Sequence, residues 1–115
     1  MFDFEKFEVY KKAKGLAKDL LMMVSDLKGP HPRMVDQLQR ASISIPLNIA
    51  EGAGRYSKAD KKHFYIIARG SVFECVAILD IVCDMGFISG PQKTEFYGRL
   101  EELSKMISGL INSQR

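Results

Sequence analysis

The sequence predicts an all-α protein, an antiparallel up-down-up-down bundle of four helices in a single domain over residues 1–115. Apolar residues recur at steps of three and four through four long segments, which is the period of a helix. No segment shows the strict alternation of apolar and polar residues that is typical of a strand. The connections between the segments are short, so neighbouring helices should run in opposite directions.

Proline and glycine delimit the first two helices. The first helix should begin near Asp3, a good N-cap residue, and end before the Lys-Gly-Pro-His-Pro sequence at residues 28–32. The second should run from about residue 33 to the Gly-Ala-Gly sequence at 52–54. Pro46 lies inside this second helix and removes one backbone donor, so we expect a kink or a local break there.

The third helix carries more apolar residues than one bundle face needs. It should begin at Ser57, with Asp60 completing a weak capping box, and end at Met85. A seven-residue repeat forms its seam towards the bundle: Phe64, Ala68, Ser71, Cys75, Ile78, Val82 and Met85. Other apolar residues fall outside this seam: Ile66, Val72, Phe73, Val76, Ala77 and Ile81. A second face of this helix should therefore contact another copy of the chain, and we expect a homo-oligomer.

The fourth helix should follow the Ser-Gly-Pro sequence at residues 89–91, where the proline suits the first helical turn. Its apolar stripe consists of Phe96, Leu100, Leu103, Ile107 and Leu110. Residues 112–115 should fray at the end of this helix.

Composition places the chain among soluble proteins, with 46% apolar residues, 27% charged residues and a net charge of +3. The longest uncharged run, residues 41–50, is about half of a membrane span, and no signal peptide is visible. Cys75 and Cys83 should lie about 12 Å apart on one helix, which is too far for a disulfide. We therefore expect a cytoplasmic protein with reduced thiols and no contact with a membrane.

Catalytic and metal-binding signals are weak. His31 and His63 have no cysteine or acid at the spacing of a metal site, and both cysteines occupy apolar helix positions. Glu51 is a candidate catalytic carboxylate, but no second acid, base or nucleophile stands at a defined spacing from it. We expect neither an enzyme nor a metal or cofactor site.

The modest net charge conceals an uneven distribution. Residues 33–69 carry seven Lys or Arg against three Asp or Glu, whereas residues 70–115 carry four against six. The positive charge gathers around the turn between the second and third helices, with Tyr56, His63 and Tyr65 interleaved. Such a cluster suits nucleic-acid phosphates and base stacking, and its plainer interpretation is a solvated helix end. The candidate contacts are Arg55, Lys58, Lys61 and Lys62, followed by Arg69 and Arg33.

Two stretches of the sequence resemble a known family. Residues 40–55 read Arg-Ala-Ser-Ile-Ser-Ile-Pro-Leu-Asn-Ile-Ala-Glu-Gly-Ala-Gly-Arg, and residues 64–74 read Phe-Tyr-Ile-Ile-Ala-Arg-Gly-Ser-Val-Phe-Glu. They resemble the four-helix-bundle proteins encoded in intervening sequences of bacterial 23S rRNA genes. They are also similar to the accessory bundle protein of diversity-generating retroelements, which assists a reverse transcriptase. The resemblance spans nearly the whole chain and implies a pentameric barrel with a central pore. Nucleic-acid binding is implied for the retroelement member.

Residues of these two stretches should hold the second and third helices together. An antiparallel pair around a turn near residues 55–58 places facing residues at numbers that sum to about 114. Arg40 should then form an ion pair with Glu74. Ser44 should face Gly70, and the two helices should approach closely there because Gly70 has no side chain and Ser44 and Ser71 are small. Asn48 and Glu51 should satisfy backbone groups freed by Pro46 or reach across to the third helix. Gly52 should help to end the second helix.

The sequence thus indicates a non-enzymatic homo-oligomer that binds RNA or DNA with little sequence preference. The alternative is a protein-interaction scaffold that docks a nucleic-acid enzyme, such as a reverse transcriptase, without binding nucleic acid itself. An affinity for nucleic acid that falls as salt rises would favour the first hypothesis, because contacts to phosphates release counterions.

Overall fold

The computed structural model describes residues 1–27, 29 and 32–114. It contains one short 3-10 helix, η1 (Asp3–Lys6), and four α-helices: α1 (Glu8–Ser25), α2 (Pro32–Ala53), α3 (Lys58–Asp84) and α4 (Gly90–Asn112). No strand occurs among the described residues, so the all-α prediction is confirmed. The expected loop around Lys28, Pro30 and His31, and the last residue of the expected frayed end, Arg115, lie outside the described residues.

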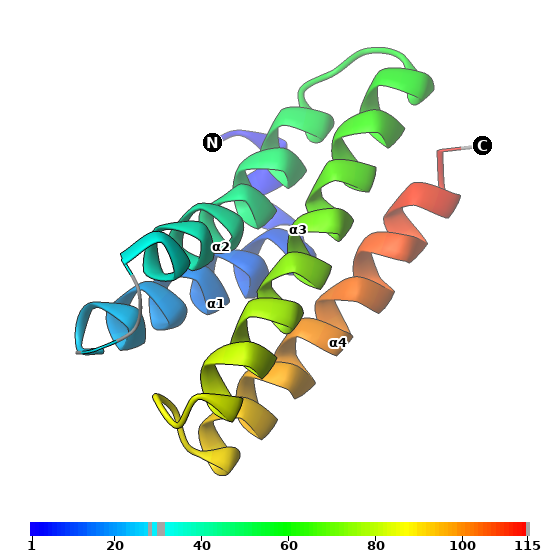
Figure 1. Ribbon diagram of the computed structural model, residues 1–115. Helices are drawn as coiled ribbons and strands as arrows, with labels where there is room; N and C mark the ends of the chain where they lie inside the picture. Colours follow the sequence, from blue (N-terminus) through cyan, green and yellow to red (C-terminus); the bar gives the residue numbers. More distant parts are fainter. Residues whose placement is uncertain (28, 30–31, 115) are drawn as a thin grey trace.

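The four helices pack side by side into an elongated bundle that measures 44 × 22 × 21 Å (Figure 1). The α2–α3 contact is the most extensive, followed by α3–α4 and α1–α2, while α1 and α4 meet least. Each helix contributes fully buried side chains to one core, including Leu16, Leu38, Leu79 and Leu103. Both termini lie towards the end of the bundle that carries the α2–α3 connection (Figure 1).

The first helical segment is divided, contrary to the single helix expected from Asp3. Asp3 begins the 3-10 turn, and Phe7 then adopts an extended conformation before α1 starts at Glu8. The turn places Phe4 edge-on against Tyr10, with 4.8 Å between their ring centroids. Aromatic packing explains why the continuous helix is interrupted here.

Pro46 is buried within α2 and does not break it. The helix continues from Pro32 to Ala53, so the expected local break is not formed. Because Pro46 has no N–H group, the Ser42 carbonyl loses its usual helical donor. The Asn48 side chain does not replace that donor and instead donates to the Ser44 carbonyl, 2.8 Å away.

The ends of α3 and α4 follow the sequence prediction closely. Ser57 caps α3 by accepting from the Asp60 amide at 3.0 Å, and Ser89 forms a capping box with Gln92 at the start of α4. Gly86 ends α3 with a φ of 83°, and the Phe87 amide donates to the Val82 carbonyl. This is the Schellman arrangement, in which glycine accepts a left-handed backbone without strain.

Most of the predicted α3 seam faces the core, including Ala68, Ser71 and Cys75. Met85, at the lower end of the seam, is 52% exposed, so its assignment to the core was wrong. It is the cap residue just beyond the last helical turn, where the neighbouring helices no longer cover it.

Among the apolar residues expected outside the seam, Ile66, Phe73, Ala77 and Ile81 are exposed and Val76 is half-buried. Val72 is buried, one turn after Ala68 on the side that faces the core, so its assignment to the outer face was wrong. The expected uncovered apolar face is therefore present within this chain.

Candidate functional site

Most of the predicted nucleic-acid contacts gather at the α2–α3 end of the bundle. We call this group the basic end; it comprises Arg55, Tyr56, Lys58, Lys61 and Lys62. Arg55 and Tyr56 lie in the connection, and the three lysines lie on the first turns of α3. All except Lys61 are exposed, and the Tyr56 side chain is fully exposed. The positive end of the α3 dipole lies at the same place.

Arg55 and Lys61 have defined partners within the chain. The Arg55 guanidinium lies 3.1 Å from Glu51 Oε2 and 4.5 Å from the centroid of the Phe64 ring. Lys61 Nζ donates to the Ala53 carbonyl at 2.9 Å and so satisfies the C-terminal end of α2. Arg55 and Lys61 therefore hold the connection in place; Glu51 offsets the charge of Arg55, and the Ala53 carbonyl occupies one N–H donor of Lys61.

Lys62 makes no hydrogen bond or ion pair with any other described residue, and its side chain is exposed. His63 next to it is also exposed, and its ring contacts Phe64 edge-on at 5.3 Å. Tyr65 was expected among the surface aromatics, but it is buried with 2% exposure. Burial raises the pKa of its phenol. The exposed aromatic rings are thus Tyr56, within the basic end, and His63, next to it.

Arg69 and Arg33 lie apart from the basic end. Arg69 is half-buried two turns further along α3, and its guanidinium stacks on the Phe73 ring at 4.7 Å. Its Nε is buried without a hydrogen-bond partner among the described residues. Arg33 is exposed at the opposite end of α2. The structure therefore does not join these two arginines to the predicted site.

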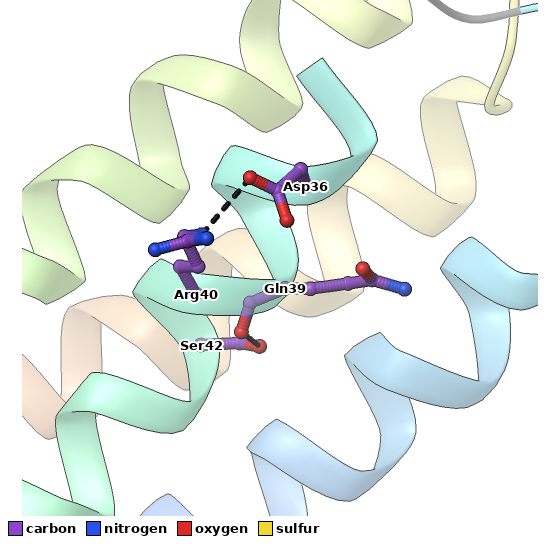
Figure 2. Close-up of polar contacts among 4 residues, drawn as sticks. All are labelled: Asp36, Gln39, Arg40 and Ser42. Atoms are coloured by element: carbon purple, nitrogen blue, oxygen red, sulfur yellow. Dashed lines mark hydrogen bonds and ion pairs between the residues drawn. The ribbon is translucent and has the colours of Figure 1, made fainter. Parts of the chain in front are cut away.

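The expected ion pair between Arg40 and Glu74 is not formed. Arg40 Nε instead contacts Asp36 Oδ2 at 2.9 Å, one turn earlier on α2 (Figure 2). A partner four residues away on the same helix face is reached without crossing between helices, and Arg40 remains 80% exposed. Glu74 is exposed and makes no ion pair with the other described residues. Figure 2 also shows Ser42, whose hydroxyl donates to the Gln39 carbonyl at 2.9 Å.

Ser44 contacts Ser71, one residue beyond the Gly70 that was expected opposite it. Ser71 Oγ donates to Ser44 Oγ at 2.8 Å, and Ser44 also accepts from Asn48 Nδ2 at 2.9 Å. Their numbers sum to 115, close to the predicted register. However, α2 and α3 approach each other closely at Gly52 and not, as expected, at Gly70. A Cβ atom on Gly52 would lie 2.6 Å from Tyr65 Cε1, whereas one on Gly70 would meet nothing within 4 Å.

Sequence reasoning missed the Gly52–Tyr65 contact because Tyr65 was grouped with the basic surface. A signal for it was present, since Tyr65 precedes Ala68 and Val72 at helical steps of three and four, and all three are buried. The buried position of Tyr65 requires a residue without a side chain on α2, and Gly52 supplies it.

Glu51, the candidate catalytic carboxylate, is exposed and paired with Arg55. Together with Phe2, Phe4 and Leu47 these two residues line an open hollow of about 540 Å³. Within the described residues, no other carboxylate or histidine lines this hollow. Nor does that part of the chain hold three or more His, Cys, Asp or Glu side chains placed to bind a metal.

The two cysteines differ in burial. Cys75 is fully buried, and desolvation, with a smaller contribution from the charge of Glu74, raises its pKa to about 12. Its thiol therefore stays protonated near neutral pH, which is the form that is a poor nucleophile. Cys83 is half-buried, and both thiols are free. None of the helices, as far as their residues are described, is long and apolar enough to cross a membrane.

Comparison with known proteins agrees with this architecture. The family described as "23S rRNA-intervening sequence protein" matches residues 5–109. Among solved structures, the chain is similar to a Bacteroides thetaiotaomicron protein of unknown function from the S23 ribosomal protein family. The two share 23% identity with a TM-score of 0.86, over 90% of this chain and 95% of the other. No curated protein matches this chain. Because the family match covers most of its length, the chain belongs to the 23S rRNA-intervening sequence protein family.

Proposed function

We propose that this protein is a non-enzymatic, cytoplasmic homo-oligomer that binds RNA or DNA through its basic end. In this proposal the helices alternate in direction, as the contacts of Ser44 with Ser71 and of Ala53 with Lys61 support. The copies form a ring, for which the family resemblance suggests five members. The apolar residues exposed along α3 support assembly, since surfaces of this kind mark protein contacts.

The observation that carries the nucleic-acid proposal is the fully exposed Tyr56 between Arg55 and Lys58, next to the uncommitted Lys62. An exposed aromatic ring flanked by cations offers stacking to a base and charge to the adjoining phosphates. A single basic end is small, but a ring repeats it around one rim. Binding should be weakly sequence-specific, because phosphate contacts carry no base information.

Fluorescence anisotropy with labelled poly(U) RNA and poly(dT) DNA tests the proposal. We expect affinity to fall steeply between about 50 and about 200 mM salt. The double variant Lys58→Glu/Lys62→Glu should weaken binding at least about tenfold at low salt. The matched control is Lys18→Glu/Lys105→Glu, which changes the net charge equally at two exposed positions outside the basic end. An equal loss of nucleic-acid affinity in both double variants would contradict the proposal. So would an affinity that does not change with salt concentration.

The α3–α4 surface supports a second candidate function, a scaffold for a partner protein such as a nucleic-acid enzyme. Two hollows of about 300 and 220 Å³ lie there, and Phe73, Val76 and Tyr97 line both. An oligomer that binds neither nucleic acid and instead captures one polymerase-type enzyme would favour this function. Loss of that capture on Tyr97→Glu would assign it to this surface.

A further inference from the structure

A hollow of about 300 Å³ lies between α1 and α4, the two helices of the bundle that meet least. Its lining combines three cations with one carboxylate, a glycine and a leucine: Lys11, Lys12, Arg99, Glu102, Gly15 and Leu103. The volume is roughly ten times that which a water molecule takes up in the liquid, so a small polyatomic ligand fits. None of these residues belongs to the basic end.

Gly15 leaves the α1 side of the hollow open. Glycine inside a helix is less favourable than alanine, so its presence in the middle of α1 calls for a reason. Among the described residues, a Cβ atom at Gly15 would meet only Arg99 Nη2, at the ordinary contact distance of 3.8 Å. Packing within the chain therefore does not require glycine here. A ligand that approaches the α1 backbone closely would require it.

Arg99 directs an unused donor group at the same place. Its Nη1 donates to Asp19 Oδ2 at 2.8 Å, and this bond orients the guanidinium group. Its Nη2 lies beside Gly15 and makes no hydrogen bond with another described residue. A planar guanidinium group held in this way suits the oxygen atoms of a phosphate group.

Lys11 and Lys12 add ammonium groups whose three donors are only partly used. Lys12 Nζ contacts Glu102 Oε1 at 2.6 Å, whereas Lys11 Nζ lies 3.6 Å from Glu8 Oε1, beyond hydrogen-bond distance. The pKa of Lys12 is raised, mainly by its hydrogen bond to Glu102, while the charge of Arg99 acts in the opposite direction. Lys12 and Arg99 thus repel each other, and an anion between them would offset that repulsion.

The charges around the hollow leave a positive surplus. The three cations of the lining are contacted by three carboxylates, those of Glu8, Asp19 and Glu102. Lys18 stands three residues after Gly15 and so on the same side of α1. It is exposed and forms no ion pair with another described residue. The hollow therefore favours an anionic ligand.

We propose that the hollow between α1 and α4 binds a small phosphorylated molecule through its phosphate group. Lys11, Lys12 and Arg99 Nη2 donate to the phosphate oxygens, because charge-assisted hydrogen bonds to a dianion are the strongest that these groups can form. Gly15 gives the ligand room against α1. Glu102, the one carboxylate of the lining, accepts from a hydroxyl group of the same molecule, so a hydroxylated phosphate ester should bind more tightly than the free ion.

Isothermal titration calorimetry with ribose 5-phosphate, inorganic phosphate and ribose tests this site. The variants are Gly15→Ala, which places a methyl group in the hollow, and Lys11→Gln, which removes one donor. The control for the first is Gly70→Ala on α3, where a Cβ atom meets nothing within 4 Å. The control for the second is Lys14→Gln, since Lys14 lies on the same helix, contacts only the Tyr10 ring and does not line the hollow.

We expect Lys11→Gln and Gly15→Ala each to weaken ribose 5-phosphate binding at least about fivefold, and the two controls less than about twofold. Gly15→Ala should not lower the thermal midpoint, because alanine is the better helix former, so lost binding there does not reflect unfolding. Affinity should rise between about pH 5 and about pH 7, since a phosphate monoester gains its second negative charge near pH 6.

Three results would overturn the inference. One is the absence of binding tighter than about 10 mM for both ribose 5-phosphate and inorganic phosphate. Another is an equal loss of affinity in Lys11→Gln and Lys14→Gln. The third is displacement of ribose 5-phosphate by poly(dT), which would make the hollow part of the nucleic-acid surface. Equal affinity for inorganic phosphate and the ester would assign the hollow to the free ion and overturn the role of Glu102.

Discussion

The hydroxyl groups of Ser44 and Ser71 are hydrogen-bonded across the α2–α3 contact, with 2.8 Å between their oxygen atoms. Ser71 is 7% exposed, so the bond is largely shielded from water. The Ser44 hydroxyl also accepts from Asn48, and the Ser71 hydroxyl lies 3.1 Å from the Ile67 carbonyl. This small polar group fixes the relative height of the two helices within an otherwise apolar contact.

Removing one hydroxyl of this pair should destabilise the bundle. Ser71→Ala should lower the free energy of unfolding by about 1 kcal/mol, because Ser44 loses its partner across the helices. Urea denaturation measures the change. Ser44→Ala and the double variant complete a thermodynamic cycle, and additive losses in that cycle would show that the two hydroxyls are not coupled.

A side chain at Gly52 should be costly. Gly52→Ala places a Cβ atom 2.6 Å from Tyr65 Cε1 and 3.1 Å from the Lys61 carbonyl oxygen. Overpacking of this kind lowers the free energy of unfolding by about 1–3 kcal/mol, even though alanine is the better helix former.

Gly98→Ala on α4 is the control for that substitution. A Cβ atom there meets nothing within 4 Å, and Gly98 is exposed within the helix. The Gly98→Ala substitution should raise the free energy of unfolding by up to about 1 kcal/mol, because alanine is the better helix former. Equal effects of Gly52→Ala and Gly98→Ala on the thermal midpoint would contradict the close contact at Gly52.

The helix ends and the α2–α3 register could be predicted because their causes are local. Ser57 and Ser89 each bond to an amide three residues later, so the short sequence contains both partners. The position of the turn near residue 56 then sets which residues of α2 and α3 are level. That geometry placed Ser44 opposite Gly70, one residue from its observed partner Ser71, without knowledge of any side-chain conformation.

Choices between competing partners could not be predicted in the same way. Arg40 had an acid on its own helix, Asp36, and another across the contact, Glu74, and the structure selects the local one. Arg55 and Lys61 were predicted to contact phosphates, whereas in the structure they bond to Glu51 and to the Ala53 carbonyl. The interruption at Phe7 likewise follows from the contact of Phe4 with Tyr10, which no periodic pattern encodes.

Alkaline pH should weaken the fold through Cys75. Its pKa is raised from 9.0 to about 12 in the folded protein, mainly by burial. Between these values the unfolded chain loses the thiol proton while the folded chain keeps it, so stability falls as pH rises. The thiol contributes a slope of up to about 1.4 kcal/mol per pH unit above pH 9.

Urea denaturation of the wild type and Cys75→Ala at a series of pH values from 8 upwards measures that slope. The variant should be less stable at pH 8, because it loses buried volume, but its stability should fall less steeply above pH 9. Tyr65, whose pKa burial also raises, weakens the fold at high pH in both proteins. Parallel curves for the two proteins would show that Cys75 is not the titrating group.

The ion pair between Arg99 and Asp19 should matter little. Their side chains are 34% and 43% exposed, with 2.8 Å between Nη1 and Oδ2. Exposed pairs of this kind contribute about 0–1 kcal/mol, since water and salt screen them. Asp19→Asn should lower the thermal midpoint slightly at low ionic strength and not at 1 M salt. A larger loss that persists at high salt would assign this pair a structural role beyond charge.

Lys61 and Lys62 are adjacent in sequence, yet they should have separate roles. Lys61→Gln removes the donor to the Ala53 carbonyl and should lower the free energy of unfolding by about 1 kcal/mol. Lys62→Gln removes an exposed cation with no bond to another described residue, so stability should stay within about 0.5 kcal/mol.

For nucleic-acid affinity, the larger effect should come from Lys62→Gln and the smaller from Lys61→Gln. Lys62→Gln should weaken poly(U) or poly(dT) binding and reduce the slope of log affinity against log salt by about 1, because one phosphate contact is lost. Lys61→Gln should leave that slope unchanged, since its ammonium is already bonded to the end of α2. Stability and salt slope are measured for both variants. A salt slope that falls with Lys61→Gln and not with Lys62→Gln would move the phosphate contact to Lys61.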